Sequence, residues 1–400
     1  MDISESEELS KPVEYEPVNV KDILIEMKDT AELLIDLSYS AVLNRSTELA
    51  AEVVRLEHKM DVLEIRAQMG LLMAARSPSD AEQLAPVLGI VTATDRISDA
   101  AGDIAKIVLE EIGLPEAMRA ALPEAVETLL RAEVADDSEY AGKTLGEIDL
   151  ESETGIRVIA LRRGDDWLLN PGPETTVNAE DIALLRGPES EIGAVFETIT
   201  GRQYDPAPPE PADIPDLERA VDAIVQMKNL SELAVDLAYS SVLFDDEELA
   251  EEVSNLEIEV DNLESRFEAW VLQAAADADD PVKLRGLIHL GTSTESISDA
   301  ALDISEGVLR DITVHPVVQL AVQESDEILT RAEIADGSRL DGTAVTGGVS
   351  DADVTMSVIA IRRPDEGWLM VADAELRGGD IVIAKGTQTT AEQFGKLARN

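Results

Sequence analysis

Residues 94–105 read TDRISDAAGDIA, and residues 294–305, two hundred positions later, read TESISDAALDIS. If the first segment is helical, its apolar residues follow one another at spacings of four and three and form one stripe: Ile97, Ala101, Ile104 and Val108. Asp95, Asp99 and Asp103 then stack along another face. Like charges four residues apart destabilise a helix by about 0.2–0.5 kcal/mol a pair, whereas a cation shared by the carboxylates would reverse the sign. The segment therefore predicts either a metal-binding face or a solvated acidic face.

The similarity of these two segments belongs to a repeat that extends over most of the chain. At a constant offset of 200, Tyr39-Ser40 matches Tyr239-Ser240, and Arg131-Ala132-Glu133 matches Arg331-Ala332-Glu333. Matches at one constant offset indicate a single tandem duplication, so each half should have the same architecture.

Apolar residues at helical spacing dominate the first part of each half. In the first copy they predict four helices, over about 19–43, 46–75, 79–113 and 116–135. Ser79 with Glu82 fits a capping box that opens the third helix. The helices are amphipathic and joined by short connections, which predicts an all-α bundle.

The pattern changes at about Asp136, where short apolar runs separated by turn residues predict strands over 144–148, 156–163 and 181–187. A proline-rich stretch at 205–211 then predicts a semi-rigid spacer. The fold class is therefore multidomain α+β, with two all-α bundles alternating with two small α+β domains. The expected segments are an acidic tail (1–18), a bundle (19–135), an α+β domain (136–203), a linker (204–216), a second bundle (217–335) and a second α+β domain (336–400).

Composition limits the classes of function. The chain has 32 basic and 83 acidic residues and a net charge of −51 at pH 7, which disfavours nucleic acid and anionic lipid as partners. It has no cysteine and three histidines, so we expect no disulfide, iron–sulfur cluster or His-rich metal site. No apolar run approaches the roughly 20 residues of a membrane span, and the acidic start is unlike a signal peptide. We therefore expect a cytoplasmic protein.

The diffuse acidity is typical of a halophile's surface. At molar salt the Debye length is about 3 Å, so the charges would be screened from one another. We therefore expect a halophilic archaeon as the source, and the net charge to report habitat rather than function.

Carboxylates four residues apart are the candidate site. Because acids are 83 of 400 residues, a single such pair carries little weight, and the internal copy is the better test. Residues 58–60 differ in type from residues 258–260, whereas the flanking acids are the same in both copies. Carboxylate-only ligands suit hard cations such as Mg²⁺, Mn²⁺, Ca²⁺ or Fe³⁺; the alternative is a solvated face. The candidate metal ligands are Glu57, Asp61, Asp95, Asp99, Asp103, Glu257, Asp261, Glu295, Asp299 and Asp303.

Residues 94–105 resemble the signature helix of PhoU, the phosphate-signalling regulator, and residues 57–64, EHKMDVLE, resemble its companion motif on the preceding helix. The resemblance covers about 19–135 and 217–335. It implies three-helix repeats whose E/D-x-x-x-D motifs bind multinuclear iron or other metals on their surface. This chain departs from the family at Ser296, where Arg is usual, and at Asp103 and Asp303, where Asn is usual.

The α+β segments resemble TrkA-C, the C-terminal lobe of regulator-of-K⁺-conductance (RCK) proteins. Residues 377–386, RGGDIVIAKG, carry the family's turn and strand. The first copy has NAED at 178–181 instead of the Gly-Asp turn but keeps the entry pattern LGEI at 145–148. The repeated basic pairs Arg162-Arg163 and Arg362-Arg363 are either effector contacts or, as we favour, solubilising strand ends.

The sequence has no G-x-G-x-x-G fingerprint and no nucleophile–base constellation, so we expect neither NAD binding nor enzymatic activity. The resemblances imply a cytosolic regulator of cation transport, with K⁺ as the favoured ion. It would sense a metal or small ligand and dock on a membrane transporter or channel subunit at the inner face of the membrane. One alternative is a PhoU-type regulator acting on a phosphate transporter or sensor kinase; another is a metal-binding scaffold. The two copies would pair either within one chain or between the chains of a homodimer.

Overall fold

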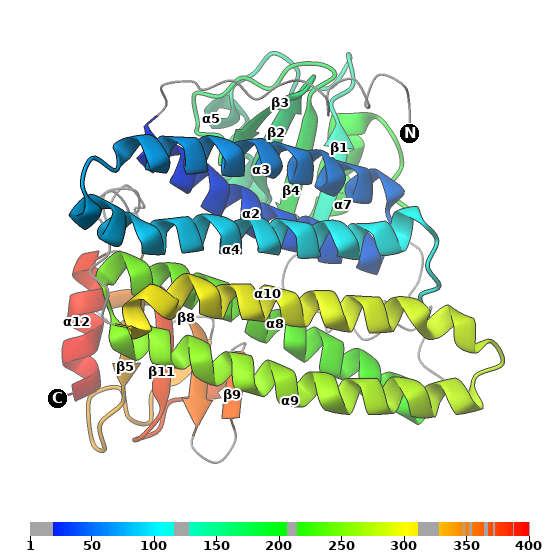
Figure 1. Ribbon diagram of the computed structural model, residues 1–400. Helices are drawn as coiled ribbons and strands as arrows, with labels where there is room; N and C mark the ends of the chain where they lie inside the picture. Colours follow the sequence, from blue (N-terminus) through cyan, green and yellow to red (C-terminus); the bar gives the residue numbers. More distant parts are fainter. Residues whose placement is uncertain are drawn as a thin grey trace.

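The structure is a computed structural model that describes residues 19–115, 128–205, 214–310, 328–346, 349–351, 354–363, 367–370, 373–386 and 388–399. Two bundles of long helices lie against one another, and a small α+β lobe packs on each bundle (Figure 1). The expected tail at 1–18 and most of the expected linker lie outside the described residues.

The first bundle consists of α2 (Val20–Asn44), α3 (Thr47–Ala74) and α4 (Pro78–Leu109). The first two helices begin where the sequence predicts, because the side chains of Asn19 and Ser46 accept backbone N–H groups of the first turn. The apolar stripe of α4 is buried as expected, with Ile97, Ala101 and Ile104 all fully buried.

The predicted bounds of the third helix were wrong at both ends. Ser77, not Ser79, is the N-cap: its hydroxyl accepts from Asp80 N at 3.2 Å, and Pro78 takes the first helical position. The helix ends at Leu109 rather than Gly113, because Glu111 adopts a left-handed φ of 52° and Ile112 N donates to Ile107 O at 2.9 Å. This is the Schellman arrangement, in which the chain turns away from the helix axis.

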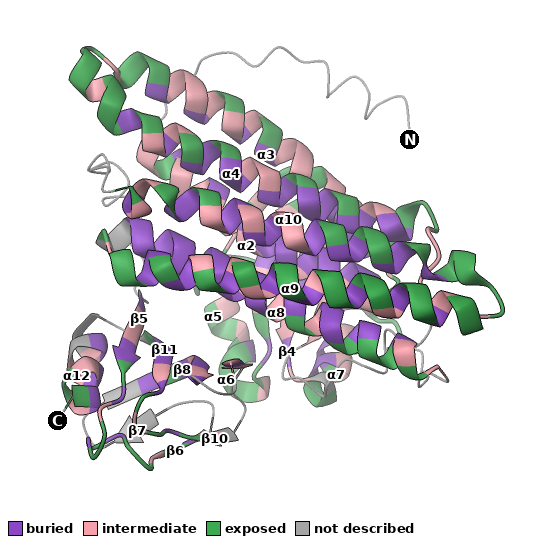
Figure 2. Cartoon of the chain, turned by 60° about the horizontal axis from the view of Figure 1, so that its bottom comes forward, coloured by how far each residue is buried: buried purple, intermediate pink, exposed green. Residues whose placement is uncertain are grey.

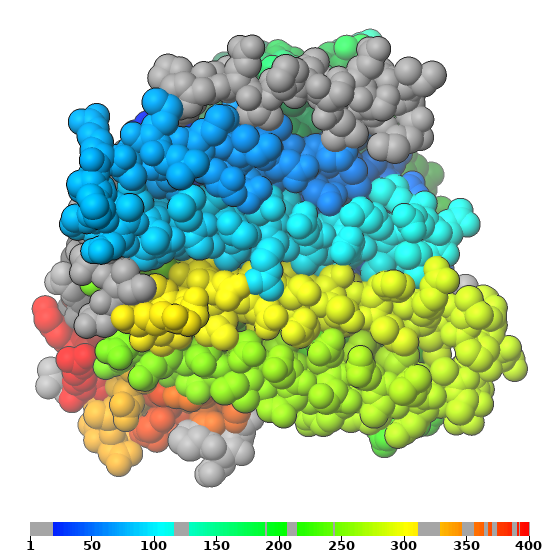
Figure 3. Space-filling model, in the orientation of Figure 1, coloured from blue at the N-terminus to red at the C-terminus, as the bar shows by residue number. Residues whose placement is uncertain are grey.

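The second bundle repeats the first with α8 (Pro215–Phe244), α9 (Glu247–Asp277), the short 3₁₀ helix η2 (Pro281–Leu284) and α10 (Arg285–Leu309). α10 is the counterpart of α4 and packs directly against it, so the two form the central layer of the face seen in Figure 3. Buried residues follow the inner faces of the helices and exposed ones follow the outer face of α9 (Figure 2). One continuous apolar core contains residues of both bundles.

The two copies therefore pair within one chain, which the sequence left open. Their helices also meet where α4 has ended: Gly286 N, in α10, donates to Gly113 O at 2.9 Å. A Cβ added at Gly286 would lie 2.6 Å from that carbonyl oxygen, so the close approach of the two backbones requires glycine there. The two halves are accordingly packed against one another.

Each bundle carries a lobe built on an antiparallel sheet. The first lobe has strand order β1-β4-β2-β3, and its helices are α5, α6 and α7. Its elements are β1 (Thr128–Glu133), α5 (Leu145–Ile148), α6 (Leu150–Thr154), β2 (Arg157–Arg163), β3 (Asp166–Leu169), β4 (Ile182–Gly187) and α7 (Glu189–Thr200).

The second lobe repeats this order as β5-β11-β8, with β9 also paired to β8. Its elements are β5 (Ile328–Glu333), β6 (Ala344–Thr346), β7 (Val349–Asp351), β8 (Val354–Arg363), β9 (Gly367–Met370), β10 (Asp373–Glu375), β11 (Ile381–Gly386) and α12 (Gln388–Arg399).

Two predictions for the lobes were wrong. The helix expected over 116–135 does not extend over its last part, since residues 128–133 form β1 and pair with β4; residues 116–127 lie outside the described part. The equivalent stretch of the second copy is β5. The strand expected at 144–148 is the short helix α5, because Thr144 and Glu147 form a capping box that satisfies the first N–H groups of a helix. Among the described residues, no helix combines the length and the apolar character needed to cross a membrane.

Candidate functional site

The predicted metal ligands lie on facing helices of each bundle. Glu57 and Asp61 lie on α3 opposite Asp95 and Asp99 on α4, and the second copy places its equivalents on α9 and α10. The four-residue spacing puts both acids of each helix on one face, and these faces meet, since, besides burial, Asp61 raises the pKa of Asp99 and Asp261 raises the pKa of Asp299. Each copy therefore has one carboxylate cluster, which we call the first and the second cluster.

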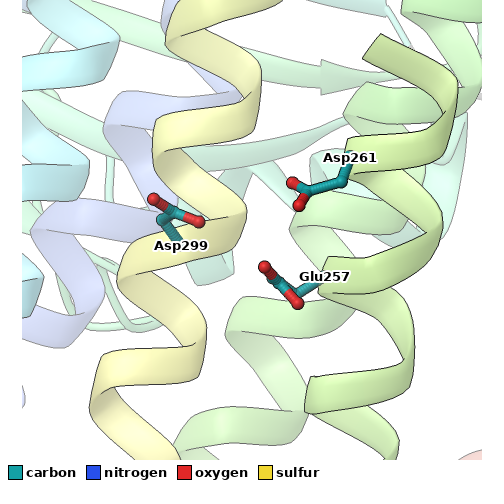
Figure 4. A group of neighbouring side chains, drawn as sticks. All are labelled: Glu257, Asp261 and Asp299. Carbon is teal, nitrogen blue, oxygen red and sulfur yellow. The ribbon is translucent and has the colours of Figure 1, made fainter. Parts of the chain in front are cut away.

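The second cluster is the more compact one. Glu257, Asp261 and Asp299 each offer one carboxylate oxygen, and these atoms all lie within 4.8 Å of one another (Figure 4). Hard cations bind carboxylate oxygens at about 2.0–2.6 Å, and an ion between three oxygens at this separation would lie at most about 2.8 Å from each, so a small inward movement of the side chains would bring all three into range. Among the described residues, this is the one group whose three carboxylates lie at such short separations.

Glu295 lies one turn before Asp299 and extends the second cluster. Burial raises the pKa of Glu295 to about 7, with further contributions from Asp299, Glu264 and Asp261. The pKa of Asp299 is also raised, chiefly by burial. These raised values indicate carboxylates whose negative charges are poorly compensated, which is the electrostatic condition that favours a bound cation.

Asp303 is engaged with the other copy. Arg96 of α4 pairs with Asp303, and its second guanidinium nitrogen lies 3.9 Å from Asp299 Oδ2. An arginine of the first bundle therefore reaches the edge of the second cluster. Ser296 occupies the equivalent position in α10. It carries no charge, so it cannot form the reciprocal ion pair with the acids of the first cluster.

The first cluster contains a cation of its own. Lys106 Nζ lies 2.9 Å from Asp103 Oδ1 and 3.4 Å from Glu57 Oε1, whereas the second copy has Glu306 at this position. Gly102 makes room for this arrangement, since a Cβ there would lie 2.4 Å from the Glu57 carboxylate. The second copy has Leu302 at the equivalent position. The two clusters are therefore chemically different although their acids are retained.

Asp95 is the least compensated member of the first cluster. Burial raises its pKa to about 7, with contributions from Glu64, Asp99 and Asp61, and its Oδ1 is buried without a hydrogen-bond partner. Glu64 and its counterpart Glu264 thus act on the clusters although the sequence analysis did not single them out. Each lies seven residues after the first acid of its pair, on the same helix face, which is the signal that would have identified it.

The repeated arginine pairs have structural partners. Arg163 pairs with Asp181 at 2.7 Å and Arg363 pairs with Asp380 at 3.2 Å, so the end of β2 or β8 is joined to the turn before its sheet neighbour, β4 or β11. Arg162 and Arg131 both bind Glu52 of α3, with nitrogen–oxygen distances of 2.7–3.0 Å. The contacts of Arg131 and Arg162 with Glu52 hold the lobe on its bundle. They favour a structural role for the repeated arginines over an effector site.

Glu52 was not identified from the sequence. Its side chain is fully buried, and its counterpart Glu252 binds Arg331 and Arg362 in the same way. Burial acts to raise the pKa of Glu52, but hydrogen bonds from Arg162 and Arg131 outweigh it and hold the pKa below its ordinary value. The same three-residue contact therefore joins lobe to bundle in both copies.

Comparison with known proteins identifies the domains. A family model of the PhoU domain matches residues 24–108 and 224–308, and a model of the TrkA-C domain matches residues 129–200. The TrkA-C match falls on the first lobe, which lacks the Gly-Asp turn. The second lobe has the same order of its principal strands.

One curated protein and two solved structures illustrate the similarity. The Ktr system potassium uptake protein C of Bacillus subtilis (strain 168) is 30% identical over 60 residues, which are 15% of this chain. The match spans about a quarter of that protein's length, 27%. PhoU from Pseudomonas aeruginosa matches with a TM-score of 0.39 and 15% identity, over 76% of this chain and 96% of that one. The GsuK RCK domain matches with a TM-score of 0.18 and 16% identity, over 68% of this chain and 64% of that one. The chain thus contains two PhoU domains and, after the first of them, a TrkA-C domain.

Proposed function

We propose that the protein is a non-enzymatic regulator of cation transport, with K⁺ as the transported ion, and that it docks on a membrane transporter or channel subunit. The observation that carries this proposal is the TrkA-C domain together with the similarity to a protein named for potassium uptake. The arrangement of the chain supports it, because each lobe is fixed to a bundle through a buried glutamate and the bundles share one core. A change at one bundle can therefore reach both lobes.

The metal-sensing part of the proposal rests on the second cluster. A divalent or trivalent hard cation (Mg²⁺, Mn²⁺, Ca²⁺ or Fe³⁺) held by Glu257, Asp261 and Asp299 would neutralise carboxylates that repel one another. It would also compete with Arg96 for Asp299, and so alter a contact between the two bundles. The first cluster is the weaker candidate, because Lys106 already pairs with Glu57.

A thermal shift experiment tests the metal site. Binding stabilises the folded chain by RT ln(1+[L]/Kd), about 2.7 kcal/mol at a hundredfold excess over Kd. We expect Mn²⁺ to raise the melting temperature of the wild type, and Asp299→Asn to abolish this shift. The matched control is Asp99→Asn, at the same position of the first copy, which should retain most of it. No shift in the wild type beyond an ionic-strength control would identify the clusters as solvated faces.

A PhoU-type role in phosphate control is the second candidate, and the two PhoU domains favour it. Deletion of the gene separates the two roles. A regulator of K⁺ transport should alter the uptake of Rb⁺, a K⁺ tracer, and growth in limiting K⁺, while phosphate uptake is unchanged. The opposite result, with altered phosphate uptake and normal Rb⁺ uptake, would favour the PhoU-type role.

A further inference from the structure

A cavity lies at the junction of the first bundle and the first lobe, away from the carboxylate clusters. Its volume is about 260 Å³, and α2, α3 and β3 supply its walls. Its lining residues are Asp22, Ile25, Glu26, Asp29, Lys59, Trp167 and Leu169. This volume is slightly below the range of about 300–1,000 Å³ of pockets for drug-sized ligands, so a ligand of few non-hydrogen atoms would fit.

The cavity is negatively charged although it contains a lysine. Lys59 Nζ lies 2.7 Å from Glu26 Oε1, so this pair is internally compensated. Asp22 and Asp29 add two negative charges, and Asn170 Nδ2 is 3.5 Å from Asp29 Oδ2. Burial raises the pKa of Asp29, and Lys28 lowers it. The ionised form of Asp29 therefore lacks full solvation, which a cation in the cavity would relieve.

The remaining walls are apolar. Ile25, Trp167 and Leu169 are all half-buried, so each presents part of its side chain to the cavity. The Arg162 guanidinium carbon lies 5.8 Å from the Trp167 ring centroid, and its charge is compensated by Glu52. An indole ring beside carboxylates favours a cation that also has an apolar body, because the ring face attracts the charge and the apolar groups leave water.

The second copy offers an internal comparison. Gln226 and Asn229 stand where the first copy has Glu26 and Asp29, but Glu259 stands where it has Lys59, so the charge is arranged differently without a change in its sum. The tryptophan of β9, Trp368, is 6% exposed and packs with the core. The first copy thus differs from the second in having a carboxylate at position 29 and a tryptophan that is only half-buried.

We propose that this cavity binds a small organic cation, an alkylammonium or quaternary ammonium ion, between the carboxylates of Asp29 and Asp22 and the ring of Trp167. The ligand touches α2 and α3 on one side and β3 on the other, so its binding stabilises the seat of the first lobe on its bundle. This site goes beyond the proposed role in K⁺ transport, and binding to it does not depend on that role.

Isothermal titration calorimetry of the full chain tests the site, with choline as the probe, in KCl at a concentration that keeps the protein folded. The matched neutral probe is 3,3-dimethylbutan-1-ol, which has the shape of choline without its charge. We expect one choline per chain and no saturable binding of the alcohol. Trp167→Leu should weaken choline binding by roughly three- to thirtyfold, as a lost cation–π contact predicts.

Replacing Glu26 and Asp29 by the residues of the second copy tests whether choline binding requires the negative charge of the cavity. The variant Glu26→Gln/Asp29→Asn removes the Asp29 charge and leaves Lys59 without its partner, so it should weaken choline binding by about tenfold or more. Asp222→Asn/Glu251→Gln removes the same charge from exposed positions of the second copy and should bind as the wild type does, which excludes general attraction to an acidic protein. The proposal is overturned if the alcohol binds as tightly as choline, if the Glu26→Gln/Asp29→Asn variant binds like the wild type, or if the folded wild type gives no saturable heat.

Discussion

The Tyr39 hydroxyl on α2 lies 2.6 Å from Oγ1 of Thr294 on α10, so the two copies are joined by a buried hydrogen bond. The reverse contact exists as well, since Thr94 Oγ1 lies 2.6 Å from the Tyr239 hydroxyl. Lys28 and Lys228 lie 5.8 Å from the ring centroids of Tyr239 and Tyr39. Thr94 and Thr294 open the repeated segments, so residues next in sequence to the candidate metal ligands also hold the bundles together.

Removing these hydroxyls should destabilise the whole chain. Tyr39→Phe and Tyr239→Phe each delete one buried hydrogen bond, which costs about 1 kcal/mol of unfolding free energy. The double variant should lose about twice that, measured by urea unfolding. Tyr140→Phe, in the first lobe and away from the bundle interface, is the control and should change the free energy by less than about 0.5 kcal/mol. Equal effects of all three variants would contradict an interface role.

Substitution of Glu52 should lower the free energy of unfolding more than substitution of Tyr39 or Tyr239. Glu52→Gln removes the buried carboxylate that the half-buried Arg131 and Arg162 share and leaves Arg131 only the exposed Glu48, and breaking a buried pair costs about 3–5 kcal/mol. Because the folded pKa of Glu52 is lowered, its stabilisation is present above the unfolded pKa and is lost as pH falls through the folded pKa. The effect of the variant should therefore be large at pH 7 and shrink in acid. Glu48→Gln, an exposed neighbour 3.7 Å from Arg131, is the control. A pH-independent effect would contradict this account.

The carboxylate clusters predict an opposite pH dependence. Asp95 and Glu295 have folded pKa values of about 7, above their unfolded values of about 4, so the folded state binds more protons in this window. Without divalent ions, stability should fall as pH rises from 5 to 8. Asp95→Asn/Glu295→Gln should flatten this dependence, measured as the urea midpoint at each pH. Glu110→Gln, exposed at the end of α4, should not. If the urea midpoint of the double variant changes with pH as steeply as that of the wild type, Asp95 and Glu295 do not cause the pH dependence.

Salt should stabilise the chain. With a net charge of −51, lowering KCl from molar to about 0.1 M extends the Debye length from about 3 to about 10 Å and strengthens surface repulsion. The melting temperature should fall with KCl, and sucrose at equal osmolality should not replace the salt. A flat or inverse dependence would remove the link between the acidity and a saline habitat.

Most of the helical architecture could be predicted, because the apolar spacing of α2, α3 and α4 and the repeat itself are local signals. The strand β1 could not be predicted, since residues 128–133 become a strand only by pairing with β4, 49 to 59 residues later. The segment at 144–148 was misread because its capping box outweighs its apolar residues.

The candidate acids were identified because both copies retain them, and the structure places them on facing helices. The chemical difference between the first and the second cluster was not predicted. It depends on Lys106 lying beside Glu57 in space and on Arg96 crossing from one bundle to the other, contacts between residues 49 and 207 positions apart. Sequence spacing within one helix carries no information on such partners.

The most direct test of the proposed function is co-purification of the intact tagged chain from crosslinked cells. The full chain is required because the two halves share one core. Membrane proteins recovered with it are compared with those from cells that express an unrelated acidic tagged protein. We predict specific recovery of an integral membrane cation transporter or channel subunit. Recovery of no such protein, together with normal growth of the deletion strain in limiting K⁺ and in limiting phosphate, would contradict the regulator role and leave a metal-binding scaffold.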